Sequence, residues 1–190
     1  MFQVRFHGRG GQGVVTASEV LSVAAFLENR HAQAFPSFGS ERKGAPVVAF
    51  CRIDDKEIRL REPIMEPDAL IVQDPTLFKA IDVCQGLKRT GYLLVNSNRP
   101  LHELHLDKIV KELPAGHVLT VPATDFAMKY IGRPLPNAAL LGAFAALTGV
   151  VQLKSVVAAI HDAFPAEKIA LANIAAATAA YDAVNAQAAA

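Results

Sequence analysis

The sequence has few cysteines, almost no net charge and no long apolar run, and each absence argues against a class of protein. Its two cysteines, Cys51 and Cys84, belong to no CxxC motif, which argues against a zinc site or an iron–sulfur cluster held by this chain alone. Separate free cysteines are instead typical of a cytoplasmic protein with reduced thiols. The net charge of +1 gives no electrostatic footprint for nucleic acid or an anionic membrane.

Two further absences concern targeting. No apolar stretch reaches the roughly 18 uninterrupted residues that a membrane span needs. The N-terminus has no basic region followed by an apolar core, so we expect no secretory signal. These features predict a cytoplasmic protein with neither nucleic acid nor membrane as a partner.

Hydrophobic residues make up 52% of the 190 residues, which is enough to bury a core. This length fits one domain. We expect a single domain over residues 1–185, followed by a frayed, alanine-rich tail at residues 186–190.

The hydrophobic pattern along the chain alternates between strand and helix periods. We expect strands at residues 2–7, 68–73, 92–95 and 118–121, and a β-hairpin formed by residues 46–53 and 56–60 around Asp54-Asp55. We expect helices at residues 14–25, 76–87 and 104–113, and from Thr124 onward with breaks at 134–136, Gly149 and Pro165. This alternation predicts a three-layer α/β/α sandwich with a mostly parallel, mixed sheet.

The strongest local signal is a glycine-rich turn between the first strand and the first helix. It consists of Gly8, Arg9, Gly10, Gly11, Gln12 and Gly13. Unpaired backbone N–H groups and the helix dipole favour an anion at a helix N-terminus, and glycines let the main chain approach a phosphate closely. The turn therefore suggests a phosphate-bearing partner.

The same turn lacks the remaining parts of the known dinucleotide and nucleotide motifs. A Rossmann site needs an acidic residue at the end of the second strand, and Glu28 belongs to the preceding helix by its pattern. No Gly-Lys-Ser or Gly-Lys-Thr follows, so the turn is not a P-loop. Two interpretations stay open, a contact with the phosphate of another ligand and a tight turn at a subunit interface.

Other polar residues have mainly structural interpretations. Asn137 precedes an apolar helical run and is as well explained as a helix N-cap as by a ligand contact. Asp74-Pro75 is typical of a helix-entry turn. His102 and His105 are three residues apart without a third ligand nearby, so we expect no metal site there.

Taken in order, the motifs resemble the gamma subunit of 2-oxoacid:acceptor oxidoreductases, the family of pyruvate:ferredoxin oxidoreductase. The resemblance begins at the glycine turn and continues through the segments at residues 36–47, 63–64 and 67–72. It extends to Pro136-Asn137-Ala138, residues 141–143 and Asn173, so that it covers nearly the whole chain. Lys43 is a small departure, because the family often has an arginine or a glycine there.

The resemblance implies a non-catalytic subunit of a larger enzyme that decarboxylates pyruvate or a related, even aromatic, 2-oxoacid to an acyl-CoA. Its partners would be alpha, beta and ferredoxin-like delta subunits, with ferredoxin as the usual acceptor or an additional flavin-bearing subunit passing electrons to NAD. The complex would use thiamine diphosphate, Mg²⁺, [4Fe-4S] clusters and coenzyme A, none of the redox groups being held by this chain.

On this resemblance, the chain would shape the active-site cleft and the coenzyme A path. The implied contacts are the glycine turn, Asn137 and four residues of the segment 36–46, namely Ser40, Glu41, Arg42 and Lys43. We assign no general acid or base to this chain. The alternatives are a free-standing nucleotide-binding oxidoreductase and a regulatory nucleotide-binding module, both of which would bind a nucleotide without partners.

Overall fold

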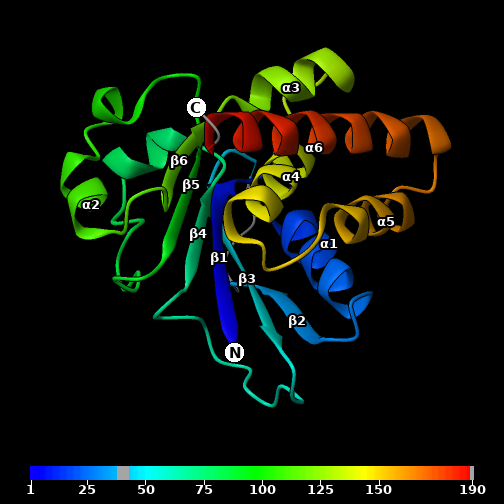
Figure 1. Ribbon diagram of the computed structural model, residues 1–190, viewed down its shortest axis with the longest axis horizontal. Coiled ribbons are helices and arrows are strands. Elements are labelled where there is room, and N and C mark those ends of the chain that lie inside the picture. Colours follow the sequence, from blue (N-terminus) through cyan, green and yellow to red (C-terminus); the bar gives the residue numbers. More distant parts are fainter. Residues whose placement is uncertain (38–42, 189–190) are drawn as a thin grey trace.

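A six-stranded mixed sheet forms the centre of the computed structural model, which describes residues 1–37 and 43–188 (Figure 1). The strands are β1 (Phe2–Arg9), β2 (His31–Pro36), β3 (Pro46–Asp54), β4 (Ala69–Val72), β5 (Tyr92–Asn96) and β6 (Val118–Val121), in the order β2-β3-β1-β4-β5-β6. β1, β4, β5 and β6 pair in parallel, whereas β3 is antiparallel to both β1 and β2. The predicted mostly parallel, mixed sheet is confirmed.

Helices cover both faces of this sheet, unequally. One face carries α1 (Val14–Phe26), α3 (Ala123–Tyr130), α4 (Asn137–Thr148), α5 (Leu153–Ala163) and α6 (Glu167–Ala188). The other carries the short α2 (Asp107–Glu112) and the 3₁₀ helices η1 (Pro75–Lys79) and η2 (Leu101–Leu104), as Figure 1 shows.

Alternation along the strands supplies a hydrophobic core to each face. Phe6, Ile71 and Leu94 pack with the large helical layer, while Leu70 and Val95 pack on the opposite side. The chain therefore has the three layers that the sequence predicts. In the described part of the chain, no helix has the combined length and hydropathy of a membrane span.

The sequence pattern located most elements correctly. The buried strands, α1 directly after the glycine turn, and the helices after Thr124 are all confirmed. Gly149 ends α4 in the left-handed conformation, with φ 63°. α6 continues through Ala188, beyond the boundary expected at residue 185, and residues 189–190 lie outside the described part.

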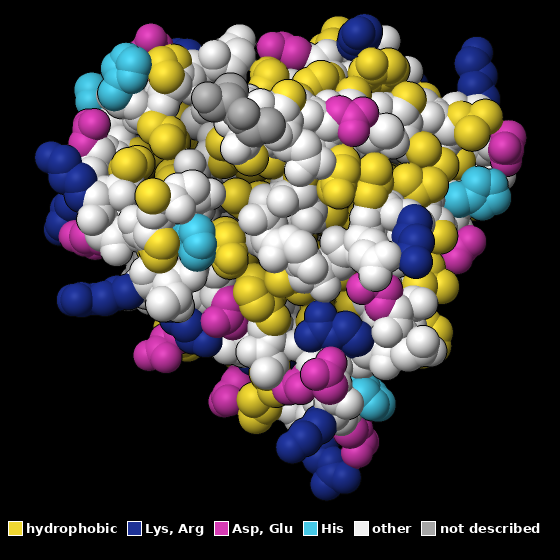
Figure 2. All heavy atoms as spheres, in the orientation of Figure 1, with side chains coloured by type: hydrophobic (Ala, Val, Ile, Leu, Met, Phe, Trp, Pro, Cys, Tyr) yellow, Lys and Arg dark blue, Asp and Glu magenta, His cyan; other side chains and the backbone are white. Residues whose placement is uncertain are grey.

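The predicted hairpin of residues 46–53 and 56–60 is wrong. Both edges of β3 are already occupied, by β1 on one side and β2 on the other, so no edge remains for a returning strand. The buried Arg52 side chain donates to the carbonyl oxygens of Leu60 at 3.5 Å and Glu62 at 2.6 Å, which ties the segment after β3 to the sheet. The loop after β3 lies at the narrow lower end of the view in Figure 2, which shows charged side chains gathered there.

The predicted helix at residues 76–87 is also wrong. Only the 3₁₀ helix η1 forms, and turns follow it. The buried Arg5 guanidinium donates to the carbonyl oxygens of Val83 and Gln85, and in the expected helix the Val83 carbonyl would instead accept from the backbone N–H of Leu87. The predicted helix at residues 104–113 is shorter than expected, because His105 adopts φ 57° between η2 and α2.

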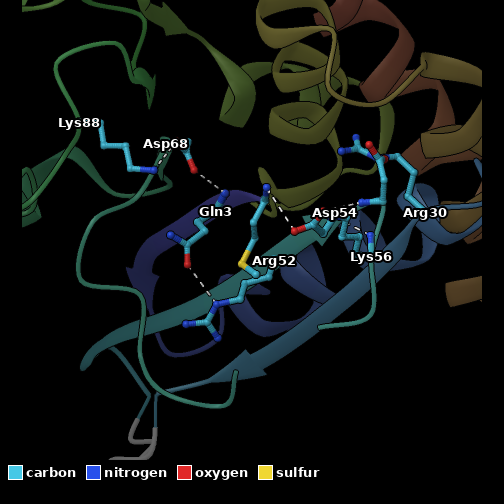
Figure 3. A network of polar contacts seen from close by, with 9 residues as sticks. Gln3, Arg30, Arg52, Asp54, Lys56, Asp68 and Lys88 are labelled. Atoms are coloured by element: carbon cyan, nitrogen blue, oxygen red, sulfur yellow. Dashed lines mark hydrogen bonds and ion pairs between the residues drawn. The ribbon is translucent and has the colours of Figure 1, made fainter. Parts of the chain in front are cut away.

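Side-chain ties also fix the amino ends of the central strands (Figure 3). Asp68 accepts from the backbone N–H of Gln3 at 2.8 Å and from Lys88 Nζ at 2.7 Å. Arg52 Nε donates to Gln3 Oε1 at 3.1 Å. These contacts lie at the amino ends of β1 and β4, whereas the glycine turn lies at the opposite, carboxyl end of β1.

Candidate functional site

A pocket of about 760 Å³ opens where the glycine turn, the start of α1, the start of α4 and the start of α6 meet. We call it the glycine-loop pocket. It is lined by Arg9, Gly10, Gly11, Gly13, Val14, Val15, Thr16, Lys43, Val47, Ile131, Arg133, Leu135, Asn137, Phe164, Ile169 and Asn173. Segments from both halves of the chain therefore build one site at the carboxyl end of β1.

The start of α1 presents backbone amides to this pocket. Gly13 occupies the cap position with φ 73°, a conformation that favours glycine, and no side chain caps the helix. The first intrahelical bond runs from the N–H of Ala17 to the Gly13 carbonyl at 2.9 Å, so the preceding first-turn amides have no intrahelical acceptor. The first turn contains no acidic residue, which leaves the positive end of the helix dipole uncompensated by its own side chains.

Asn137 lies against Gly13 on the opposite wall. A Cβ atom at position 13 would stand 2.7 Å from Asn137 Nδ2, so a larger residue there would have to displace the Asn137 amide in addition to adopting the strained φ of 73°. Asn137 is the first residue of α4 behind the cap residue Pro136, and its side chain makes no cap hydrogen bond, so its predicted N-cap role is wrong. The Asn137 Oδ1 atom is buried and has no hydrogen-bond partner among the described residues.

The charged lining of the pocket is basic. Within residues 1–37 and 43–188 it contains Arg9, Lys43 and Arg133 and no carboxylate. A broad apolar wall completes the lining, formed by Val14, Val15, Val47, Ile131, Leu135, Phe164 and Ile169. The pocket thus combines cations and free amides with apolar surface, which suits an anionic ligand that also carries an apolar part.

The structure brings most of the implied site residues together. Of these, the pocket is lined by Arg9, Gly10, Gly11, Gly13, Lys43 and Asn137. Gly8 lies beneath the turn, where a Cβ atom would stand 2.6 Å from Val14 Cγ2. The Gln12 side chain bonds the Arg9 backbone N–H and Asp74, away from the lining. Ser40, Glu41 and Arg42 lie outside the described residues.

Three polar residues of the lining were not predicted as contacts. Thr16 lies in the first turn of α1, directly after the predicted loop. Asn173 is buried in α6, where its Nδ2 donates to the Ile169 carbonyl at 2.9 Å. Asn173 could have been predicted as a contact from its place in the family resemblance. Nothing in the local sequence indicates that the exposed Arg133 lines a pocket.

The cysteine and histidine side chains show no sign of a metal centre in the described residues. No group of three His, Cys, Asp or Glu side chains with the geometry to hold an ion occurs in this part of the chain. Burial raises the pKa of the Cys51 thiol strongly, and burial together with the charge of Asp82 raises the pKa of Cys84 to about 11. Both thiols are therefore protonated at neutral pH.

Comparison with known proteins gives a consistent result. Residues 3–183 match the family described as pyruvate ferredoxin/flavodoxin oxidoreductase. The chain is 50% identical over 167 residues to the pyruvate/ketoisovalerate oxidoreductases common subunit gamma of Thermococcus litoralis, covering 88% of this chain and 89% of that one. It is 46% identical over 183 residues to pyruvate synthase subunit PorC of Methanocaldococcus jannaschii, covering 96% of each.

A solved structure is similar along the same length. The crystal structure of pyruvate oxidoreductase subunit PorC from Thermotoga maritima superposes with a TM-score of 0.79 at 35% identity, covering 95% of each chain. Sequence and fold therefore agree over nearly the whole polypeptide.

Proposed function

The chain belongs to the pyruvate ferredoxin/flavodoxin oxidoreductase family as a gamma subunit, and from this membership we propose that its glycine-loop pocket forms part of the coenzyme A cleft of a larger enzyme. In this proposal the enzyme oxidises pyruvate or a related 2-oxoacid and transfers the acyl group to coenzyme A. The chain binds and orients coenzyme A, while partner subunits carry out the chemistry.

The observation that carries the proposal is the composition of the pocket. Its volume of about 760 Å³ lies within the range of about 300–1,000 Å³ that is usual for small-molecule sites. Coenzyme A has phosphate groups joined to a long, largely apolar arm. The first-turn amides of α1 with Lys43 and Arg133 suit the phosphates, and the apolar wall suits the arm.

The buried side-chain amide of Asn137 gives a second test of whether the pocket fits coenzyme A. Its Oδ1 atom is buried without a partner in the described chain, and such an atom costs free energy unless a ligand or water donates to it. The hydroxyl, amide and amino groups of coenzyme A could supply such a donor. The residues present therefore fit this ligand.

We assign thiamine diphosphate, Mg²⁺ and the [4Fe-4S] clusters to the neighbouring alpha, beta and delta subunits, as the family resemblance implies. Thiamine diphosphate would supply the carbanion chemistry at the 2-oxoacid, and the clusters would carry the electrons. This division predicts that the isolated chain does not turn over a 2-oxoacid. We also place the complex in the cytoplasm, where two unpaired thiols remain reduced.

The test is a kinetic measurement on the assembled complex carrying Lys43→Ala and Arg133→Ala in this subunit. We expect the KM for coenzyme A to rise about tenfold with kcat nearly unchanged, since two phosphate-binding cations are lost from a solvated site. Arg89→Ala with Lys111→Ala is a matched control, because both side chains are exposed and lie outside the pocket. An unchanged KM in an intact complex would refute the coenzyme A role.

A further inference from the structure

Asp74 is the centre of a hydrogen-bond network that joins the glycine turn to the next loop of the sheet. Its Oδ2 atom accepts from Arg9 Nε at 3.0 Å and from Gln12 Nε2 at 3.2 Å. Its Oδ1 atom accepts from the Thr76 backbone N–H at 2.9 Å and from Thr76 Oγ1 at 2.6 Å. Both carboxylate oxygens are thus used, one toward the glycine turn and one toward η1.

The position of this network follows from the sheet topology. The chain leaves β1 through α1 toward β2 on one side of the sheet, and it leaves β4 toward β5 on the other side. The carboxyl ends of β1 and β4 are therefore a topological switch point, where open α/β sheets commonly bind ligands. Here Arg9 and Asp74 meet across that crevice, and the pocket opens beside it.

The Arg9 side chain is committed to partners within the chain. Besides Asp74, its guanidinium donates to the Gly44 carbonyl at 3.1 Å through Nη1 and to Thr76 Oγ1 at 2.9 Å through Nη2. Backbone bonds join the same segments, from Gly10 N–H to the Ala45 carbonyl at 2.9 Å and from Gly44 N–H to the Gly10 carbonyl at 3.0 Å. Arg9 therefore fixes the segment that carries Lys43 to the glycine turn.

The carboxylate of Asp74 keeps its charge in this setting. Burial raises the pKa of Asp74, but the hydrogen bonds from Thr76 and Gln12 and the charge of Arg9 outweigh that effect and leave the pKa below its ordinary value. The side chain is 14% exposed, so the ion pair with Arg9 is only partly screened by solvent.

We propose that Asp74 is a positioning residue for the coenzyme A site, holding Arg9 and Gln12 so that the glycine turn and Lys43 keep the geometry that receives phosphate. This inference rests on the proposed function of the pocket. It assigns Arg9 a structural duty, with Lys43 and Arg133 as the cations that meet the ligand.

Asp74→Asn separates this role from the capping of η1. Asparagine offers one acceptor oxygen and one donor nitrogen, and it is as good an N-cap as aspartate. Its oxygen can keep the Thr76 bonds while its NH₂ group faces the donors of Arg9 and Gln12. The variant therefore removes the anchor of the glycine turn and keeps the cap.

Asp68→Asn is a matched control at the opposite end of β4. Asp68 is 20% exposed, accepts one backbone N–H and forms one ion pair, with Lys88 (Figure 3). Like Asp74→Asn, the Asp68→Asn variant loses one negative charge and one ion pair, but it does so at the end of β4 that lies away from the pocket. Thr76→Val is a milder second variant, because it removes the hydroxyl that accepts from Arg9 Nη2 and donates to Asp74, and it leaves the carboxylate in place.

The experiment measures, in the assembled complex, the kinetics with coenzyme A, its Kd by calorimetry and backbone amide exchange in residues 9–16. For Asp74→Asn we expect KM and Kd to rise about tenfold at nearly constant kcat, and for Thr76→Val about threefold. Amide exchange in the glycine turn should quicken in both variants and stay unchanged in Asp68→Asn.

Two outcomes separate the inference from the function on which it rests. If Asp74→Asn and Thr76→Val match Asp68→Asn in Kd and in amide exchange while Lys43→Ala with Arg133→Ala still weakens binding, the positioning role is wrong and the pocket function stands. If the Lys43 and Arg133 variant binds coenzyme A normally, the pocket function itself is wrong, and the positioning role toward that ligand falls with it.

Discussion

Arg5 and Arg52 are buried cations whose acceptors are mainly backbone carbonyls. Arg5 is 8% exposed and Arg52 is 1% exposed, and they bond loop carbonyls at residues 60–64 and 83–85. Burial lowers the pKa of both guanidinium groups from the ordinary value. These two side chains hold in place the loops that occupy the positions of the predicted helix and of the second strand of the predicted hairpin.

His7 shares this environment and gives the stability of the fold a pH dependence. It accepts from Arg5 Nε at 3.0 Å, and burial followed by the charge of Arg5 lowers the pKa of His7 to about 3. The unfolded chain binds a proton near pH 6.5, whereas the folded chain does not. His7 therefore adds to stability above pH 6.5, and this contribution is lost as the pH falls toward 3.

We expect the free energy of unfolding to fall by about 2 kcal/mol between pH 7 and pH 5 through His7 alone. His7→Gln keeps an acceptor for Arg5 and removes the titrating group, so its stability should change less over the same interval. Denaturant unfolding of both proteins at the two pH values measures the difference. Equal losses in the two proteins would show that His7 does not carry this dependence.

At the scale of elements, the close crossing of α4 and α6 depends on one glycine. A Cβ atom on Gly142 would stand only 1.9 Å from the Ala177 carbonyl oxygen, so the two helices touch backbone to backbone. Alanine-rich α6 makes this possible, since Ala176, Ala177 and Ala180 are fully buried against the same core. The crossing places Asn137 at the start of α4 and Asn173 in α6 on the same pocket.

Gly142→Ala should destabilise the chain by about 2 kcal/mol, because the overpacked crossing outweighs the better helix propensity of alanine. Gly149→Ala is the comparison, since it has φ 63° and no atom within 4 Å of its added Cβ, and we expect it to cost about 1 kcal/mol of backbone strain. Urea unfolding midpoints measure both. A Gly142→Ala variant as stable as Gly149→Ala would contradict the tight crossing.

Elements with strong local periods could be predicted from the sequence, and those decided by distant partners could not. β1, α1 and the buried strands β4 and β5 carry their own pattern, and the glycine turn marks its own helix start. The helix expected after Thr76 has a good local pattern as well. In the folded chain Arg5, which lies 78 and 80 residues earlier, donates to the carbonyl oxygens of Val83 and Gln85, and no local pattern predicts that contact.

At the scale of the whole molecule, the sequence predicts only part of the candidate site. The glycine turn is contiguous, so its role as an anion cradle could be proposed from local chemistry, and Asn137 entered through the family resemblance. Arg133 and Asn173 reach the pocket only because α3, α4 and α6 fold over the carboxyl end of β1. The bond of Arg9 to Asp74 depends in the same way on strand order, which the sequence alone does not state.

The most direct measurement is photoaffinity labelling of the native complex with coenzyme A that carries a diazirine on its apolar arm. Peptide mapping by mass spectrometry then locates the adducts. We expect adducts on this chain within residues 9–16 and 131–137, suppressed by excess unmodified coenzyme A. Efficient, competable labelling found only on the other subunits would contradict the claim that this chain lines the coenzyme A cleft.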